Sequence, residues 1–107
     1  MMSNILYCTA QFTPKAGQLN KLFNILKSLE PDTLREKGCI SYRVTKQIQN
    51  NFAEGKSMPI VFHEVWESIE AFEQHCQRDA IVSFFEKECL DAQGLVEAYN
   101  VTVYRDE

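Results

Sequence analysis

The stretch that decides the fold runs VFHEVWESIEAFEQH, from Val61 to His75. Up to Trp66 it is rich in β-branched and aromatic residues, which favour a strand. Ser68 is then a candidate helix N-cap, and Ile69, Phe72 and Cys76 follow at helical spacing. The sequence therefore predicts a strand that passes directly into an amphipathic helix, with the change at Ser68.

The segments on either side complete an alternating pattern of strands and helices. Strands are expected over residues 4–12, 39–48, 60–67 and 95–105. The first helix is expected to begin at Pro14, with Thr13 as its cap, and to reach about Glu30; a turn then ends at Gly38. A second helical region is expected from Ser68 to about Gln93, with a joint at Arg78-Asp79. The order is that of the ferredoxin-like βαββαβ fold, an α+β class with four antiparallel strands and both helices on one face.

This arrangement leaves one face of the sheet without helices. Either Tyr7, Val61, Val65, Val101 and their strand neighbours or the opposite set must occupy that face, and neither set is polar enough to face water comfortably. We therefore expect a homodimer in which the open sheet face packs against a second copy.

Length and composition limit the classes of partner. The chain of 107 residues is expected to form a single domain, 1–107, and its net charge of −4 with scattered basic residues argues against nucleic acid. No apolar run approaches the roughly 20 residues needed to cross a bilayer, so no membrane partner is expected. The four cysteines have neither zinc-site nor CxxC spacing and no secretory signal precedes them, which is typical of reduced thiols in a cytoplasmic protein.

Glu64 and His75 are the candidate catalytic residues. Glu64 shares a strand face with Phe62 and Trp66, so its carboxylate must either pair, for example with Arg43 or a lysine, or have its pKa raised. His75 falls at the edge of the apolar helix face, where it is either exposed or at the rim of a pocket. Imidazole titrates near neutral pH, so it is suited to carry a proton.

Trp66 and Phe72 are candidate substrate-binding residues. The indole of Trp66 is either ordinary core or a flat wall for an aromatic substrate, with its N–H holding a hydroxyl or carbonyl. His63 lies on the opposite strand face and is expected to point toward the dimer interface.

No metal or organic cofactor is expected. The two histidines and the dispersed cysteines supply no three-ligand set. A Gly-rich phosphate loop, a nucleophile elbow and a dinucleotide fingerprint are all lacking in the sequence, so neither nicotinamide nor flavin is indicated.

Three segments together resemble a known family. PKAGQLNKL (14–22), EKGCISYRV (36–44) and FHEVWESIEAFEQH (62–75) are similar to the antibiotic biosynthesis monooxygenase domain, with its Gly before the first helix, its Gly-Cys-x-x-Tyr strand opening and its Glu-x-Trp-x-Ser followed by Ala-aromatic-x-x-His. The resemblance implies a dimeric α+β barrel, and it adds Tyr42, which matches a family position, to the candidate pocket residues. Haem-degrading relatives use a first-strand Asn and a later helical His, but Thr9 and Ala10 occupy the nearest first-strand positions and residues 79–89 contain no His.

The resemblance implies a cofactor-independent monooxygenase acting on a quinol or polyphenol. A deprotonated phenol can itself give an electron to dioxygen, so the protein need only remove the proton, hold the anion and exclude water. Two alternatives stay open: an isomerase or lyase of a small hydroxy-carbonyl compound, and a non-catalytic dimer that binds small aromatics. The polar loop at 49–59 fits either a lid over the site or a long hairpin connection.

Overall fold

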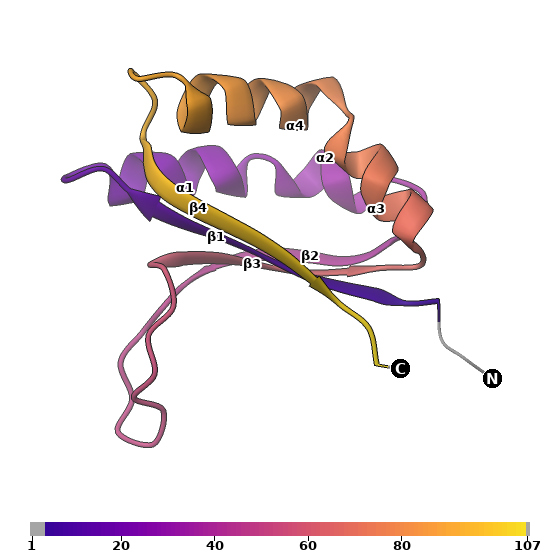
Figure 1. The fold of residues 1–107 in the computed structure, drawn as a ribbon, viewed down its shortest axis with the longest axis horizontal. Helices are drawn as coiled ribbons and strands as arrows, with labels where there is room; N and C mark the ends of the chain where they lie inside the picture. Colours follow the sequence, from indigo (N-terminus) through magenta and orange to yellow (C-terminus); the bar gives the residue numbers. More distant parts are fainter. Residues whose placement is uncertain (1–3, 107) are drawn as a thin grey trace.

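A four-stranded antiparallel sheet with all helices on one face forms the molecule (Figure 1). The structure is a computed structural model and describes residues 4–106. Its elements are β1 (Leu6–Pro14), α1 (Leu19–Lys27), α2 (Glu30–Leu34), β2 (Cys39–Lys46), β3 (Ile60–Trp66), α3 (Ile69–Cys76), α4 (Asp79–Phe84), a π-helical segment η1 (Phe85–Leu90) and β4 (Val96–Tyr104). The strand order β2-β3-β1-β4 confirms the predicted ferredoxin-like fold class.

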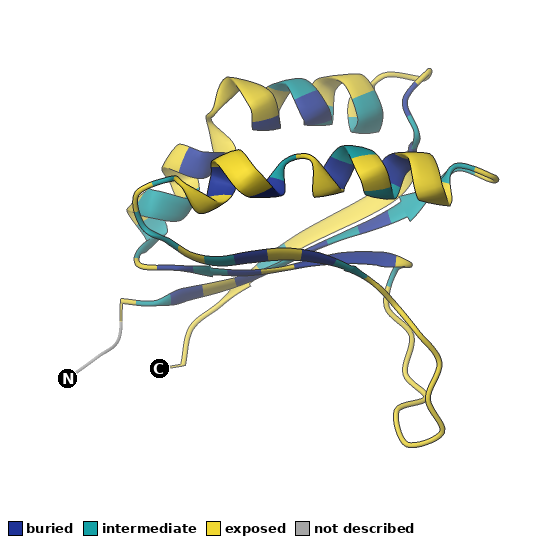
Figure 2. Ribbon diagram, turned by 180° about the vertical axis from the view of Figure 1, so that it is seen from behind, coloured by how far each residue is buried: buried dark blue, intermediate teal, exposed yellow. Residues whose placement is uncertain are grey.

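The core lies between the helices and the sheet, and buried residues recur along both layers (Figure 2). In the central pair β1 and β3, Cys8 lies opposite Glu64 and Ala10 opposite Phe62, so alternate side chains of both strands face the helices. The largest fully buried side chains are Trp66, Phe12, Phe62, Leu22, Leu26 and Ile60. The strand predicted from the opening stretch is therefore the centre of the core.

The start of the first helix differs from the prediction. Pro14 is the last residue of β1, because β1 pairs with β4 up to Pro14, which lies opposite Val96. The Lys15 N–H then donates to the Leu95 carbonyl, and Gly17 turns the chain with a φ of 78°. The predicted helix start at Pro14 was wrong because the cross-strand pairing extends the strand.

Gly38 brings α3 close to the segment that precedes β2. Its φ is 89°, and a Cβ at this position would lie 2.5 Å from the Cβ of Ala71 in α3. Only glycine allows both this backbone conformation and this approach. The contact matters for the site, because it packs the first turn of α3 against the chain two residues after Glu36, and Glu36 contacts His75 in the last turn of the same helix.

The open face of the sheet is mixed rather than uniformly apolar. Val101 lies opposite Ala10 and so faces the helix side, which corrects its predicted grouping with Tyr7 and Val61. His63 is exposed on the open face, as expected, and bonds to the Thr45 hydroxyl at 3.1 Å. No helix within residues 4–106 is long and apolar enough to span a membrane.

The connection between β2 and β3 is a projecting arm. Residues 47–59 extend from the sheet on the side away from the helices (Figures 1 and 2). Ile48 and Phe52 in this arm are largely exposed, with Phe52 fully so. The arm therefore does not cover the helix side of its own chain, where the cavity described next is found.

Candidate active site

A cavity of 260 Å³ lies between the helices and the sheet. It is lined by Ala10, Phe12, Leu26, Leu29, Tyr42, Phe62, Glu64, Phe72, His75, Cys76, Ile81, Phe84, Phe85 and Val101. The walls are mainly aromatic and aliphatic, and among the described residues no lysine or arginine belongs to the lining. Cys76 and Val101 are exposed, so the cavity reaches solvent near the end of α3 and beside β4.

Glu64 is a buried carboxyl group on the floor of this cavity. Its Oε1 accepts a hydrogen bond of 3.0 Å from the Trp66 indole N–H, and the thiol of Cys8 on the neighbouring strand also bonds to it. Burial raises the pKa of Glu64 to about 7, although both hydrogen bonds oppose the rise. Near neutral pH the group is therefore divided between a neutral acid and a carboxylate.

The predicted partner of Glu64 was wrong. Arg43 lies opposite His63 in the β2–β3 register, on the open face, so it cannot reach a carboxylate that faces the helices. The alternative prediction was that an acid without a charged partner has a raised pKa, and this agrees with the raised pKa of Glu64.

His75 is buried, with 4% of its surface exposed, rather than at the edge of the apolar face. It lies in the last turn of α3, its ring is 4.7 Å from the indole of Trp66 and 5.2 Å from the ring of Tyr42, and its Nδ1 is 3.0 Å from Oε2 of Glu36. Burial lowers the pKa of His75, and the neighbouring Glu36 only partly opposes this. The imidazole is consequently neutral at pH 7 and able to accept a proton.

Glu36 and Arg78 belong to the site but were not predicted. The Glu36 side chain is 7% exposed, and its Oε2 also lies 3.5 Å from Nε of the half-exposed Arg78. Glu36 stands within the quoted EKGCISYRV segment, yet it contacts a histidine 39 positions later. No local spacing signals a contact over that distance in the sequence.

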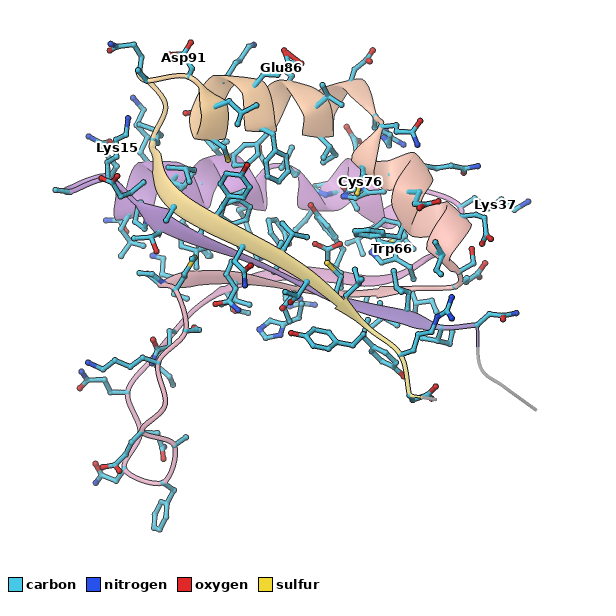
Figure 3. The ribbon with its side chains drawn as sticks, viewed as in Figure 1. Lys15, Lys37, Trp66, Cys76, Glu86 and Asp91 are labelled. Carbon is cyan, nitrogen blue, oxygen red and sulfur yellow. The ribbon has the colours of Figure 1, made fainter. Side chains whose placement is uncertain are left out.

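The three predicted binding residues occupy two layers. Tyr42 and Phe72 line the cavity, and the Tyr42 hydroxyl is hydrogen-bonded to Thr33, so this residue presents its ring. Trp66 has no exposed surface and is not part of the lining; it lies between the sheet and α3 (Figure 3), with its ring against that of His75. Its N–H donates to Glu64, so in this geometry the indole does not contact a substrate in the cavity directly, contrary to the prediction.

The thiols near the site are poor nucleophiles. Partial burial of the thiol, together with the negative charges of Glu64 and Glu36, raises the pKa of Cys76 to about 11, although the residue as a whole is exposed. Burial raises the pKa of Cys8 further. Within residues 4–106, no three His, Cys, Asp or Glu side chains are grouped so that they could hold a metal ion. The reactive groups of the cavity are therefore the imidazole and the carboxyl.

Comparison with known families decides the relationship of the chain. The model for the family described as antibiotic biosynthesis monooxygenase matches residues 5–87, which include every residue of the Glu64–His75–Glu36 arrangement. The chain belongs to the antibiotic biosynthesis monooxygenase family. A comparison with curated proteins found no match.

Several solved structures share the fold of this chain. A protein from Shewanella oneidensis is 33% identical over 97% of this chain and 93% of its own, with a TM-score of 0.77. A protein from Pseudomonas aeruginosa is 20% identical over 100% of this chain and 98% of its own, with a TM-score of 0.78. A protein from Bacteroides fragilis, described as dimeric, of unknown function and of ferredoxin-like fold, is 9% identical over 98% of this chain and 99% of its own, with a TM-score of 0.70.

Within this antibiotic biosynthesis monooxygenase domain, the arrangement can exchange protons with a small apolar molecule. His75 is neutral at pH 7, and Glu64 holds its proton up to about pH 7, so an acceptor and a donor face one cavity. The apolar walls limit water, which strengthens any hydrogen bond made inside. Such a site is suited to the removal of a proton from a hydroxyl or an activated carbon.

Proposed function

We propose that this chain is a cofactor-independent monooxygenase acting on a quinol or another polyphenolic small molecule. The observation that carries the proposal is that His75 and Glu64, with pKa values moved in opposite directions, line the same largely apolar cavity. Membership in the antibiotic biosynthesis monooxygenase family supports the class of reaction.

The cavity supports an uncharged ring system as substrate. Its volume of 260 Å³ is just below the range of about 300–1,000 Å³ that holds drug-sized ligands, which favours a compact molecule. Phe12, Phe62, Phe72, Phe84 and Phe85 provide flat apolar walls. Because the described lining includes no lysine or arginine, a substrate carrying a carboxylate or phosphate would lack a counter-charge.

In this mechanism, His75 removes the proton of a substrate hydroxyl. Transfer from a phenol with a pKa of about 10 to an imidazole of ordinary pKa, about 6.5, is uphill by roughly 5 kcal/mol in water. The lowered pKa of His75 adds to this cost. The contact between imidazolium and phenolate, and a hydrogen bond from the protonated Glu64, offset this cost in a largely apolar site.

The phenolate then supplies the electrons that dioxygen needs. It gives one electron to dioxygen, and the resulting radical and superoxide combine at a ring carbon to form a peroxide anion. The imidazolium of His75 returns its proton to this anion, which gives the hydroperoxide. Loss of water leaves a carbonyl group, so one phenol and one dioxygen become one quinone and one water. The protein takes part by moving the proton, holding the anion and keeping solvent out.

We further propose that the chain acts as a cytoplasmic homodimer through the open face of its sheet. Val61 and Val65 lie on that face among polar neighbours, and Tyr7 and Tyr104 on the same face remain about half exposed. The dimeric relative from Bacteroides fragilis supports this assembly. Four free cysteines, all within the described residues, suit a reducing compartment.

A second candidate function uses the same two groups without oxygen. An acid and a base that face one cavity can also move a proton between two carbons of a hydroxy-carbonyl compound, which is isomerase chemistry. The observation that favours it is the pairing of Glu64 and His75 in one lining. Turnover under strictly anaerobic conditions distinguishes this candidate from the oxygenase.

The test is dissolved-oxygen uptake by metal-stripped protein with hydroquinones, naphthoquinols and anthrones. We expect uptake above the uncatalysed rate that falls at least tenfold in His75→Ala, because the proton acceptor is removed. His63→Ala is the matched control, since His63 lies on the opposite face of the sheet and should leave uptake unchanged. Full activity in His75→Ala, or no uptake with any of these substrates, would contradict the proposal.

A further inference from the structure

Glu36 is a buried acidic side chain that the mechanism above does not yet use. It lies in the short segment between α2 and β2, and its backbone is held at both ends, since its N–H donates to the Thr33 carbonyl and its carbonyl accepts from Cys39. The side chain is 7% exposed and extends toward the last turn of α3. A carboxylate this buried needs specific partners.

Its partners are His75 and Arg78. Oε2 of Glu36 is 3.0 Å from Nδ1 of His75 and 3.5 Å from Nε of Arg78. The guanidinium is a positive charge that complements the carboxylate beside it. Arg78 thus links the buried pair to the surface, because nearly half of its side chain is exposed.

The contact determines which nitrogen of the imidazole carries the proton. An ionised carboxylate can only accept hydrogen bonds, so Nδ1 of the neutral imidazole must be the protonated nitrogen. Nε2 then bears the free electron pair. Glu36 is not part of the cavity lining whereas His75 is, so the ring edge left toward the cavity carries Nε2.

The surrounding rings prevent the imidazole from turning over. Trp66 packs on it at 4.7 Å and Tyr42 meets it edge-on at 5.2 Å, with ring planes inclined by 66°. Rotation about the Cβ–Cγ bond would break the Glu36 bond and displace both aromatic contacts. The neutral ring is thereby held in one tautomer and one orientation.

We propose that Glu36 is the positioning residue of this site: through Nδ1 it fixes the tautomer of His75 so that Nε2 faces the cavity as the base, and it stabilises the imidazolium once the proton is taken. Arg78 completes the arrangement by pairing with the Glu36 carboxylate on its outer side. The step in which the base takes a proton rests on the proposed function, whereas the orientation and tautomer are properties of the resting protein.

Nitrogen NMR of the imidazole ring tests the proposal without any substrate. In the wild-type protein at pH 7.5 we expect His75 to show a protonated Nδ1 and an unprotonated Nε2. Glu36→Gln offers an amide that can either accept from or donate to Nδ1, so a substantial fraction of the other tautomer is expected. A wild-type ring that carries its proton mainly on Nε2 would overturn the proposal, even if the variant failed to fold.

Kinetics and titration provide the second readout. For Glu36→Gln we expect kcat to fall by about 10²- to 10⁴-fold, the range typical for loss of such an orienting carboxylate, with KM changed less than threefold. The pKa of His75 should also fall in this variant, because Glu36 opposes the lowering of the pKa by burial. The other titratable or charged groups that face the ring are Arg78 from the chain after α3, Glu64 from β3 and Tyr42 from β2. Glu36→Gln with unchanged kcat and an unchanged tautomer would overturn the assignment.

Glu30 offers a matched control. Like Glu36, it is a largely buried glutamate outside the cavity lining. Its Oε2 accepts from the Val44 N–H at 2.8 Å, and its Oε1 pairs with Lys27. Glu30→Gln removes a buried charge of the same kind, yet it should leave the His75 tautomer and kcat within threefold of wild type. If no substrate gives turnover in any variant, the proposed function fails while the NMR result still decides the role of Glu36.

Discussion

Replacing Glu64 by Gln should stabilise the folded protein, and by an amount that grows with pH. The carboxyl group has a pKa of about 7 in the folded protein against an ordinary value of 4.5, so the folded state binds its proton more tightly than the unfolded chain does. Ionisation therefore destabilises the fold: the effect is absent below about pH 4.5 and complete above about pH 7. At 1.36 kcal/mol per unit of pKa, the difference corresponds to about 3 kcal/mol.

The assay is urea unfolding of both proteins at a series of pH values from about 4.5 to 8.5. Trp66 is the single tryptophan and its indole bonds to Glu64, so its fluorescence reports on unfolding at the site. Both proteins are compared at one fixed concentration, because assembly would make stability depend on it. Glutamine keeps an oxygen that can accept from the indole, so the variant loses the titration while that hydrogen bond is retained.

The difference between the two proteins isolates Glu64 from other titrating groups. The lowered pKa of His75 works in the opposite direction, since it weakens the fold as the pH falls below 6.5 in both proteins. We expect the variant to gain about 3 kcal/mol relative to wild type between pH 4.5 and 8. A Glu64→Gln difference that stays constant over this range would refute the raised pKa and the neutral-acid role.

Three further substitutions or reactions test the local structure. Gly38→Ala should destabilise the protein by at least about 2 kcal/mol in thermal or urea unfolding, because the new Cβ would sit on a left-handed backbone and 2.5 Å from the Cβ of Ala71. As a control, Gly55→Ala should change stability by less than about 0.5 kcal/mol, because its Cβ would meet nothing within 4 Å. Ser68→Ala should cost about 1 kcal/mol in the same measurement, because the hydroxyl accepts from the Ala71 N–H at the start of α3. Alkylation of Cys76 by iodoacetamide should be slow at pH 7.5 and accelerate with rising pH toward its pKa of about 11; rapid reaction at neutral pH would contradict the raised pKa.

Local patterns in the sequence predicted the elements, because each depends on residues close together in the chain. The alternation in 60–66, the cap at Ser68 and the left-handed position at Gly38 all act within a few residues, and the structure confirms each of them. The first helix start failed at Pro14, because the decision there depends on pairing with β4, more than 80 residues later. Cross-strand pairing of this kind leaves no local periodicity.

The geometry of the site was harder to predict than the strands and helices, because it depends more on contacts between residues far apart in the sequence. Ile69, Phe72 and Cys76 suggested the direction of the buried face of α3, but the face is rotated toward His75, which is buried, while Cys76 is exposed. The rotation is possible because Glu36 satisfies the imidazole N–H inside the protein, so burial of this polar ring does not leave a hydrogen bond unmade. Alternation did place Glu64 correctly on the helix side, and the family resemblance placed Tyr42 beside it.

The most direct test of the central claim is anaerobic binding of a naphthoquinol, followed by the absorbance of its ring. If His75 takes the proton inside the cavity, the wild-type protein should bind the quinol saturably and convert part of it to the phenolate at a pH where the free compound is neutral. His75→Ala should bind it in the neutral form, and His63→Ala should behave like wild type. Saturable binding without any phenolate, or an equal phenolate signal in His75→Ala, would contradict the account.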